Sequence, residues 1–488
     1  MGVLSSLEPA EVFYYFEEIS KIPRGSGNVG QISDYLKRFA EERGLRVIQD
    51  ALLNVIIFKD ATAGYEQEPV LILQGHMDMV AVQEPDCQKD MRTQGLDLGV
   101  DGDCIYAEGT SLGGDDGIAL AYALAILDSD KIAHPALEVI FTVDEETGMD
   151  GAREIDLSML RGNRLLNLDS EEEGIFLASC AGGARVCCTL QAASDMVAAQ
   201  ENRTVCRIEI KGLLGGHSGE EIDKGRGNAN VLLGQVLYRL CEQFPIQLVS
   251  AEGGLADNAI PRRAVAEILP GEDAEGVAAL LQSCAAEICG ELQSVDPAVA
   301  MDVTFAEETA VPVVFSVADT RRAAAMLAAL PNGVQRMSAD ICGLVETSLN
   351  LGILRLARGS ESLAAEFSVR SSVESAKEAL IRRLFAVTEL AGGTNTVTGA
   401  YPGWKYRTDS PLREKMIRVY RELYGTEPRV EAIHAGVECG LLGSKLVDPD
   451  CVSIGPNMRD IHTTEETLSI SSVGNVWRYL VKLLETKE

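Results

Sequence analysis

Seven imidazole or carboxylate side chains lie next to short apolar segments in the first part of the chain. They are, in chain order, His76, Asp78, Asp115, Asp116, Glu145, Glu146 and Asp169. Imidazole and carboxylate ligands without thiolate are typical of a catalytic zinc site, and they also suit cobalt or manganese. Each group alone is common in turns and on solvated surfaces, but their succession along the chain is far harder to obtain by chance. The residue types therefore predict a catalytic metal centre.

The adjacent pair Glu145 and Glu146 offers a second kind of chemistry. At the end of a strand neighbouring side chains diverge, so one carboxylate can bind a metal while the other takes a proton from water. A centre with two metals about 3.5–4 Å apart also needs a carboxylate that bridges them. The residue types alone leave Asp115 and Asp116 as alternatives for that bridge.

Four apolar segments predict the sheet that would position these side chains. The segments 52–58, 70–74, 137–143 and 164–168 are short and rich in leucine or β-branched residues. Such segments are typical of strands buried on both faces, and the apolar run 117–127 predicts a buried helix. We therefore expect an α/β catalytic domain with a mostly parallel sheet and helices on both faces. In such sheets ligands bind beyond the carboxyl ends of the strands, where these side chains would meet.

The pattern of the chain changes near residue 186 and changes back near residue 400. Alternating segments such as 204–213 predict half-exposed strands between these points, whereas the later chain, which contains His462, resembles the first part again. The length of 488 residues exceeds the roughly 250–300 at which a single core stops growing. We predict a discontinuous α/β catalytic domain, residues 1–185 and 400–488, interrupted by an inserted α+β domain at 186–399.

The composition narrows the class of partners. The chain has 43 Lys and Arg against 74 Asp and Glu, and its net charge of −31 repels nucleic acids and anionic membranes. Its 12 cysteines form no CxxC pair, which favours reduced thiols over a disulfide framework. No apolar run approaches the roughly 20 residues of a membrane span, and the N-terminal segment lacks the pattern of a secretory signal. We therefore expect a cytoplasmic protein without nucleic-acid or membrane partners.

Eleven stretches, spread over almost the whole chain, resemble a known family. They are QGHMDMV (74–80), SLGGDDGIA (111–119), TVDEETGMDGA (142–152), NLDSEEEG (167–174), LLGGHSG (213–219), NAIPRRA (258–264), LPNGVQRMS (330–338), VETSLNLG (345–352), SVRSS (368–372), HAGVECG (434–440) and IGP…DIHTTEE (454–466). The family is that of the co-catalytic di-zinc peptidases, which contains carboxypeptidase G, the aminoacylases and dipeptidases such as carnosinase. The first four stretches resemble the wider family, and the stretches between 213 and 372 together with HAGVECG resemble its subgroup of bacterial aminoacyl-histidine dipeptidases.

The resemblance implies two metal sites that share one carboxylate. His76 and Asp169 would bind one divalent metal ion, and Glu146 and His462 would bind the other. Asp115 would bridge the two. Zinc is the expected metal, with cobalt and manganese as alternatives.

The resemblance also assigns catalytic roles. Glu145 would act as general base and later as general acid. Asp78 would hold the imidazole ring of His76 by a hydrogen bond. The inserted domain at 186–399 would be the family's lid domain. His217, in its Gly-Gly-His-Ser-Gly stretch, would hydrogen-bond the carbonyl oxygen as it becomes an oxyanion. A glycine-flanked histidine with a purely structural place in a turn is the alternative for His217.

Three further residues are expected to bind the substrate. Asn258 and Arg370 are candidates for the peptide carbonyl and the terminal carboxylate, since a guanidinium pairs carboxylates in bidentate fashion. A surface arginine at a strand end is the alternative for Arg370. Glu438 would receive the substrate's α-ammonium group. His134, directly before a proline, is expected to be an ordinary surface histidine.

These roles together predict a metal-dependent dipeptidase that hydrolyses unblocked dipeptides, of the Xaa-His type and more broadly, as a monomer or homodimer. An N-acyl-amino-acid deacylase of the same family is the first alternative, since it would need the same metals but no site for an α-ammonium group. A catalytically silent metal- or peptide-binding protein is the second. The complete ligand set together with Glu145 and His217 argues against the second alternative.

Overall fold

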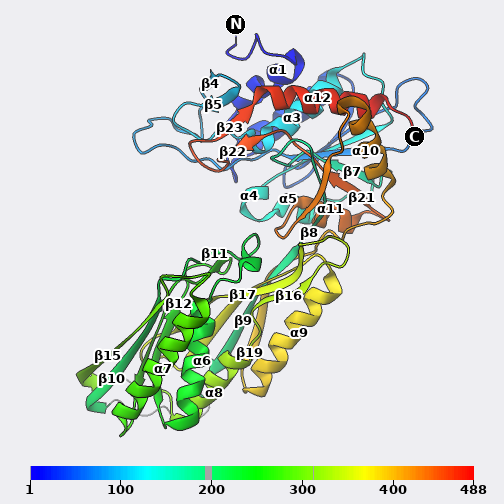
Figure 1. Cartoon of the computed structure of the whole chain (residues 1–488). Coiled ribbons are helices and arrows are strands. Elements are labelled where there is room, and N and C mark those ends of the chain that lie inside the picture. The colour runs from blue at the N-terminus through cyan, green and yellow to red at the C-terminus, as the bar shows by residue number, and fades with distance from the viewer. Residues whose placement is uncertain (1, 193–199, 312) are drawn as a thin grey trace. The chain divides into compact units, whose positions relative to one another are not determined.

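The computed structural model describes residues 2–192, 200–311 and 313–488. The chain forms two compact units. Unit 1 contains residues 1–180, 404–432 and 437–488, and unit 2 contains residues 181–403 and 433–436. Each unit has its own sheet and its own helices (Figure 1).

Unit 1 is built on a mixed eight-stranded sheet. Its strands, in spatial order, are β1 (Arg46–Gln49), β2 (Val55–Lys59), β6 (Leu137–Thr142), β3 (Leu71–His76), β7 (Arg164–Asn167), β21 (Asp450–Ser453), β8 (Ile175–Cys180) and β20 (Arg429–Ile433). The four central strands, β6, β3, β7 and β21, are parallel to their neighbours in that group. The pairings β1–β2, β2–β6 and β21–β8 are antiparallel. The expectation of a mostly parallel sheet therefore holds for the centre and is wrong for the edges.

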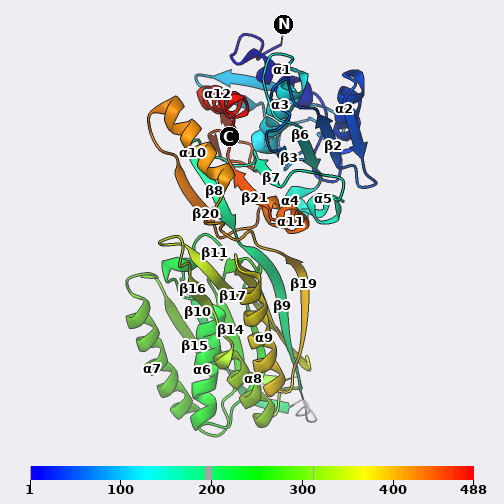
Figure 2. The same ribbon diagram turned by 90° about the vertical axis from the view of Figure 1, so that its right-hand side faces the viewer.

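Helices lie on both sides of this sheet, as Figures 1 and 2 show. The helices of unit 1 are α1 (Ala10–Ser20), α2 (Gly30–Glu42), α3 (Gly114–Asp128), α4 (Glu145–Gly148), α5 (Asp150–Glu154), α10 (Pro411–Tyr424), α11 (Glu438–Lys445) and α12 (Ile470–Glu485). Helices α1, α3 and α12 lie on one side, and α5 and α11 lie on the other (Figure 1). A small four-stranded sheet completes the unit, with the order β22 (Met458–Arg459), β23 (Thr467–Ser469), β5 (Cys104–Ala107) and β4 (Leu98–Asp101).

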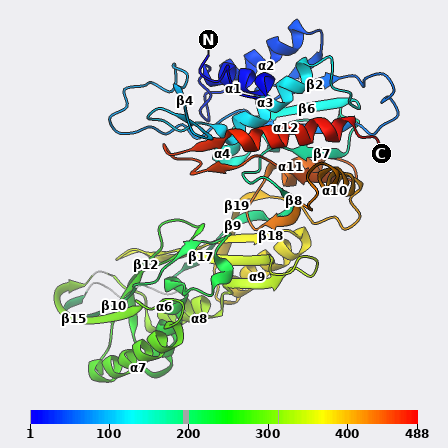
Figure 3. The ribbon, with the colours of Figure 1, turned by 45° about the horizontal axis from the view of Figure 1, so that its top comes forward.

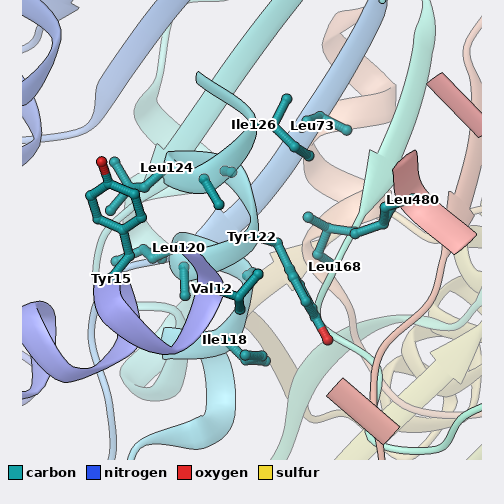
Figure 4. Close-up of a cluster of buried hydrophobic side chains, with 14 of the residues drawn as sticks. Val12, Tyr15, Leu73, Ile118, Leu120, Tyr122, Leu124, Ile126, Leu168 and Leu480 are labelled. Carbon is teal, nitrogen blue, oxygen red and sulfur yellow. The ribbon is translucent and has the colours of Figure 1, made fainter. Parts of the chain in front are cut away.

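The core of unit 1 surrounds α3. Every residue from Gly114 to Leu127 is buried, and from Gly117 onward the segment is apolar on all sides of the helix. Figure 4 shows side chains of α3, among them Leu120 and Tyr122, within a cluster that also contains Val12 of α1 and Leu480 of α12. Burying a leucine or isoleucine side chain contributes about 1.5–3 kcal/mol, so the packing of α3 is strongly fixed. The acidic residues at the start of α3 are fixed with it.

The carboxyl ends of the parallel strands meet at one edge of the sheet. His76, the last residue of β3, lies opposite Thr142, the last residue of β6. Gln74 of β3 lies opposite Asn167, the last residue of β7. Residues directly after these positions therefore leave the sheet side by side, as the sequence predicted for the segments around His76, Glu145 and Asp169.

Unit 2 is an antiparallel sheet with helices packed on one face (Figures 1 and 3). The sheet has the order β15 (Ala300–Val311), β10 (Gln200–Lys211), β14 (Ala264–Leu269), β12 (Gln247–Gly253), β17 (Val345–Leu356), β18 (Ser362–Ser371), β9 (Gly182–Gln191) and β19 (Thr394–Tyr401), with β16 (Gly333–Met337) pairing β17. The helices are α6 (Ala229–Gln243), α7 (Ala274–Leu292), α8 (Val317–Ala329) and α9 (Glu374–Leu390). Polar side chains cap three of them, Asn228 at α6, Asp273 at α7 and Ser316 at α8.

A separate two-stranded ribbon in unit 2 consists of β11 (Gly216–His217) and β13 (Ala259–Ile260). In this ribbon His217 pairs with Ala259. The predicted residue Asn258 directly precedes Ala259 and therefore lies next to the partner of His217. No helix within the described part of the chain is long and apolar enough to cross a membrane.

Candidate metal centre

The carboxylate of Asp115 lies between two histidines of unit 1. Its Oδ1 is 3.0 Å from Nε2 of His76, and its Oδ2 is 3.1 Å from Nε2 of His462. His76 ends strand β3, whereas His462 lies in the loop between β22 and β23 with a left-handed φ of +63°. One carboxylate thus presents a different oxygen to each of two imidazole nitrogens.

Each histidine has a second carboxylate as a neighbour. Nε2 of His76 is 3.5 Å from Oδ1 of Asp169, and Nε2 of His462 is 3.0 Å from Oε1 of Glu146. The structure therefore forms two groups, His76 with Asp169 and His462 with Glu146, that share Asp115.

The donor atoms suit divalent cations of the zinc type. Three groups in the described residues have histidine and carboxylate atoms within 4.8 Å of one another: His76, Asp116 and Asp169; His76, Glu145 and Glu146; and Asp115, Glu146 and His462. All of these donors are imidazole nitrogens or carboxylate oxygens, which zinc, cobalt and manganese accept. The chemistry of this donor set fits two metal ions.

Asp116, the alternative bridge, has a different environment. Its Oδ2 accepts a hydrogen bond of 3.1 Å from the backbone N–H of His76, and its Oδ1 is buried without a hydrogen-bond partner. Burial raises the pKa of Asp116 well above its usual value, and the negative charge of Asp169 adds to this rise. No contact of this carboxylate with His462 is present, so Asp115 is the better placed of the two to bridge.

The electrostatics of the group favour positive charge on the imidazole nitrogens. Burial alone would lower the pKa of His76, but the negative charge of Asp169 and hydrogen bonds with carboxylates raise it well above its usual value. Hydrogen bonds with Asp115 and Glu146 raise the pKa of His462 to about 10. Burial would raise the pKa of Asp115, but its hydrogen bonds to His462 and His76 hold it below the ordinary value. The carboxylates thus create a site that stabilises cations.

Asp78 connects the metal ligands to the other candidate catalytic residue. Its Oδ1 is 3.4 Å from Nδ1 of His76 and accepts a hydrogen bond of 3.1 Å from the backbone N–H of Glu145. Its Oδ2 accepts a hydrogen bond of 2.8 Å from the hydroxyl of Ser26. Asp78 is fully buried, so this arrangement is protected from solvent. Asp78 therefore lies against the His76 ring and holds the start of α4 by its hydrogen bond with the backbone of Glu145.

Glu145 begins α4 directly after Asp144, whose backbone is left-handed with φ of +54°. Burial raises the pKa of Glu145 well above its usual value, against the opposing charge of His76 and with the support of the neighbouring carboxylate of Asp169. A carboxyl group with a raised pKa keeps its proton to a higher pH than an ordinary glutamate does, and a raised pKa is common in general acids and bases.

Glu438 is buried in unit 1, and only one of its two carboxylate oxygens has hydrogen-bond partners. Its Oε2 accepts hydrogen bonds of 2.6 Å from Nε2 of Gln74 and 2.7 Å from the hydroxyl of Thr142. The side chain is fully buried, and burial raises its pKa to about 7. Gln74 in turn accepts a hydrogen bond of 2.6 Å from Nδ2 of Asn167. These polar residues join the ends of β6, β3 and β7, the strands that lead to the metal ligands.

The predicted residues of unit 2 gather around the β11–β13 ribbon. His217 accepts a hydrogen bond of 3.3 Å at Nδ1 from the backbone N–H of Glu220, and burial together with the Arg370 guanidinium lowers its pKa. A groove of about 1080 Å³ includes both His217 and Asn258 in its lining. Because its pKa is lowered, the imidazole of His217 is neutral at neutral pH.

Arg370 is buried in β18 and is not a surface residue. It lies opposite Ser348 of β17, whose hydroxyl is 2.7 Å from Nε2 of His434. Burial and the charge of Arg370 lower the pKa of His434 to about 3. No role was predicted for His434 or Ser348, because their contact joins residues that are 86 positions apart in the chain.

Sequence analysis also missed two buried charged residues of unit 1, Arg24 and Glu466. Both contact the segment that carries Asp115. The prediction that His134 is a surface histidine is wrong, since this side chain is fully buried and its Nδ1 is 2.7 Å from the backbone oxygen of Pro135.

Comparison with known proteins gives the class of this chain. The sequence model of peptidase family M20/M25/M40 matches residues 72–486. The chain belongs to this family of peptidases.

Two relatives are similar over their whole length. The cytosol non-specific dipeptidase of Escherichia coli (strain K12) is 36% identical over 486 residues, which is 99% of each chain. The crystal structure of an aminoacylhistidine dipeptidase from Vibrio alginolyticus is 37% identical, with a TM-score of 0.91 over 99% of this chain and 98% of that one. The aminopeptidase PepT from Bacillus cereus is 16% identical with a TM-score of 0.55, covers 98% of each chain and shows the fold alone.

Proposed function

We propose that this protein is a metal-dependent dipeptidase that hydrolyses the peptide bond of unblocked dipeptides. The single observation that carries the proposal is the Asp115 carboxylate, whose two oxygens face His76 and His462. The similarity to the dipeptidases of Escherichia coli and Vibrio alginolyticus supports the substrate class.

In this proposal His76 and Asp169 hold one metal ion, Glu146 and His462 hold the other, and Asp115 bridges them. The metal is zinc, with cobalt and manganese as substitutes that the same donors accept. Two such cations would acidify a water molecule and polarise the carbonyl group of the scissile bond.

The proton path runs through Glu145. Its carboxylate takes a proton from the attacking water and later donates it to the leaving amine. Asp78 supports both steps, because it contacts the His76 ring and the backbone N–H of Glu145. The shared anchor keeps the base and one metal ligand at a constant separation.

Unit 2 supplies the groups that recognise the substrate. In this proposal unit 2 is the lid domain that the family resemblance implies. His217 is neutral and can donate a hydrogen bond to the developing oxyanion, Asn258 binds the peptide carbonyl, and Arg370 pairs with the free carboxylate. The burial of Arg370 supports this role, since a desolvated guanidinium is held ready for an anionic partner.

For Glu438 we propose a positioning role. Its Oε2 joins strands through hydrogen bonds with Gln74 and Thr142, and the side chain is fully buried. Its Oε1 has no hydrogen-bond partner, so contact with the substrate's α-ammonium group, as predicted from the sequence, is the alternative.

We further propose a cytoplasmic location, which the name of the Escherichia coli relative and the unpatterned cysteines support. A monomer and a homodimer both remain consistent with the proposed chemistry.

The experiment that tests the function is hydrolysis of Ala-His, β-Ala-His and Gly-Gly beside N-acetyl-alanine. The protein is stripped of metal and then restored with zinc, cobalt or manganese. Metal-dependent cleavage of the free dipeptides with the acetylated compound intact is the expected result. Cleavage of the acetylated compound alone would make the protein a deacylase, and binding of two metals without any turnover would make it a silent binder.

A further inference from the structure

The backbone that carries Asp115 is held by charged groups from distant parts of the sequence. Helix α3 begins at Gly114, and the backbone angles of Asp115 and Asp116 are not helical. The first N–H groups of a helix have no partner within the helix and need acceptors from elsewhere. The start of α3 is deeply buried, so water does not provide those acceptors.

Glu466 provides them. Its Oε2 accepts hydrogen bonds of 2.9 Å from the backbone N–H groups of Leu112 and Gly113. Its Oε1 accepts hydrogen bonds of 2.8 Å from Gly114 and 3.3 Å from Asp115. One buried carboxylate therefore binds four successive amides. Glu466 also lies four residues after His462, so the same short segment carries a candidate metal ligand and this acceptor.

Arg24 holds the carbonyl side of the same backbone. Its Nη2 donates to the carbonyl oxygen of Gly113, and its Nη1 donates to the carbonyl oxygens of Met77 at 3.2 Å and Asp78 at 3.0 Å. The guanidinium is buried, and a Cβ at Gly117 would collide with it. Arg24 thus ties the segment that carries Asp115 to the segment that follows His76.

We propose that Glu466 and Arg24 are positioning residues, which fix the backbone of residues 112–115 so that each oxygen of Asp115 faces a different metal site. We call the two side chains the Asp115 clamp. Glu466 sets the Asp115 segment relative to His462, and Arg24 sets it relative to His76. Those are the two histidines that the Asp115 oxygens contact, at 3.1 Å and 3.0 Å.

The geometry separates this role from general support of the core. Both side chains bond to backbone atoms of segments that hold candidate ligands, and each bond lies within three residues of such a ligand. A carboxylate that only filled space in the core would not need all four of its acceptor positions for the backbone of one segment. The inference rests on the proposed metal centre, but it makes no use of the substrate.

The test is zinc binding to folded variants, measured by competition with a chromophoric chelator. Glu466→Gln replaces one acceptor oxygen with an N–H₂ group, which faces two backbone N–H groups that then lack an acceptor. The matched control is Glu465→Gln, the exposed neighbour. Arg24→Lys keeps the charge but cannot reach three carbonyls in fixed geometry, and its control is the exposed Arg38→Lys.

We expect Glu466→Gln and Arg24→Lys to weaken the binding of zinc by about 10–100-fold, the range typical when a partner of a metal ligand is removed. In the dipeptidase assay kcat should fall more than KM changes, because the clamp does not touch substrate. The controls should bind two zinc ions with the affinity of the unaltered protein. Circular dichroism and melting temperature report whether each variant is folded.

Folded Glu466→Gln and Arg24→Lys proteins that bind two zinc ions with unaltered affinity would overturn the proposal, even if they melt at lower temperature. If Glu466→Gln does not fold, Glu466→Asp takes its place, because it keeps the charge and shortens the reach to the four amides. Unaltered zinc affinity in that variant would overturn the proposal equally. If the unaltered protein binds two zinc ions but cleaves no dipeptide, the proposed function fails while the clamp is still tested.

Discussion

The two units of this protein place their proposed functional side chains by different means. In unit 1 the parallel strands β6, β3 and β7 end at one edge, so side chains just beyond their ends converge. In unit 2 neighbouring strands run antiparallel, so their ends alternate between edges. His217 and Asn258 are instead placed by the short β11–β13 ribbon.

This difference separates the two kinds of chemistry. A metal site needs several charged ligands within a few ångströms, and the parallel edge of unit 1 collects imidazoles and carboxylates there. Unit 2 presents neutral imidazole and buried guanidinium groups, which suit recognition of carbonyl and carboxylate oxygens. We therefore expect variants of unit 1 to alter metal binding or proton transfer, and variants of unit 2 to alter turnover without loss of metal.

The largest effect is expected at Glu145 of unit 1. Glu145→Ala removes the proposed base and should lower kcat by at least about a hundredfold, since general acid–base catalysis contributes about 10²–10⁴. Zinc content should stay at two per chain, because Glu145 is not one of the proposed ligands. Glu154→Ala, an exposed position in α5, is the control. Substantial dipeptidase activity in Glu145→Ala would contradict the assigned role.

In unit 2 the corresponding test is His217→Ala. Loss of a donor to the oxyanion should lower kcat by about 10²–10³. Zinc affinity should not change, because His217 belongs to the other unit. The exposed Glu220→Gln serves as the control. Loss of zinc from His217→Ala would break the division of roles between the units.

The role of Glu438 can be separated from substrate binding by kinetics and stability together. Glu438→Leu removes the carboxylate oxygen that accepts from Gln74 and Thr142 and leaves these buried donors without an acceptor, which should cost about 1–3 kcal/mol of the free energy of unfolding. The melting temperature should fall, kcat should fall severalfold, and KM for dipeptides should stay near its original value. A large rise in KM with unaltered stability would instead support contact with the substrate's ammonium group.

The smallest effect concerns pH and the stability of unit 2. His434 has a pKa near 3 in the folded protein and about 6.5 when unfolded, so the unfolded chain takes up the proton first as the pH falls. The resulting stability is fully present above pH 6.5 and is lost by up to about 1.4 kcal/mol per pH unit below it.

His434→Gln should flatten this dependence between pH 7 and 5, as measured by hydrogen exchange of amides in β17 and β18 after correction for intrinsic rates. Ser348→Ala keeps the histidine and should retain most of the dependence. An unaltered pH dependence in His434→Gln would show that His434 is not the titrating group.

Much of unit 1 could be predicted from the sequence because its signals are local. The apolar segments 70–74 and 164–168 and the apolar run 117–127 predicted β3, β7 and α3 within a few residues. The antiparallel pairing of the edge strands was not predicted, because a short apolar segment has the same residue pattern in a parallel and in an antiparallel sheet. The choice of Asp115 over Asp116 came from family resemblance and not from residue types.

The missed residues share one physical property: their partners are far away in the chain or are backbone atoms. Arg24 and Glu466 bind backbone groups of the 112–115 segment, and nothing in their own neighbourhoods indicates this. The burial of Glu438 depends on Gln74 and Thr142, which precede it by about 300 residues or more. Such contacts follow only from the completed fold.

The central claim is that two metal ions share the carboxylate of Asp115, and anomalous X-ray diffraction of zinc-loaded crystals at the zinc edge tests it most directly. The account predicts two peaks about 3.5–4 Å apart on either side of Asp115, one beside His76 and Asp169 and the other beside Glu146 and His462. A single peak, or a pair bridged by Asp116 in place of Asp115, would contradict it.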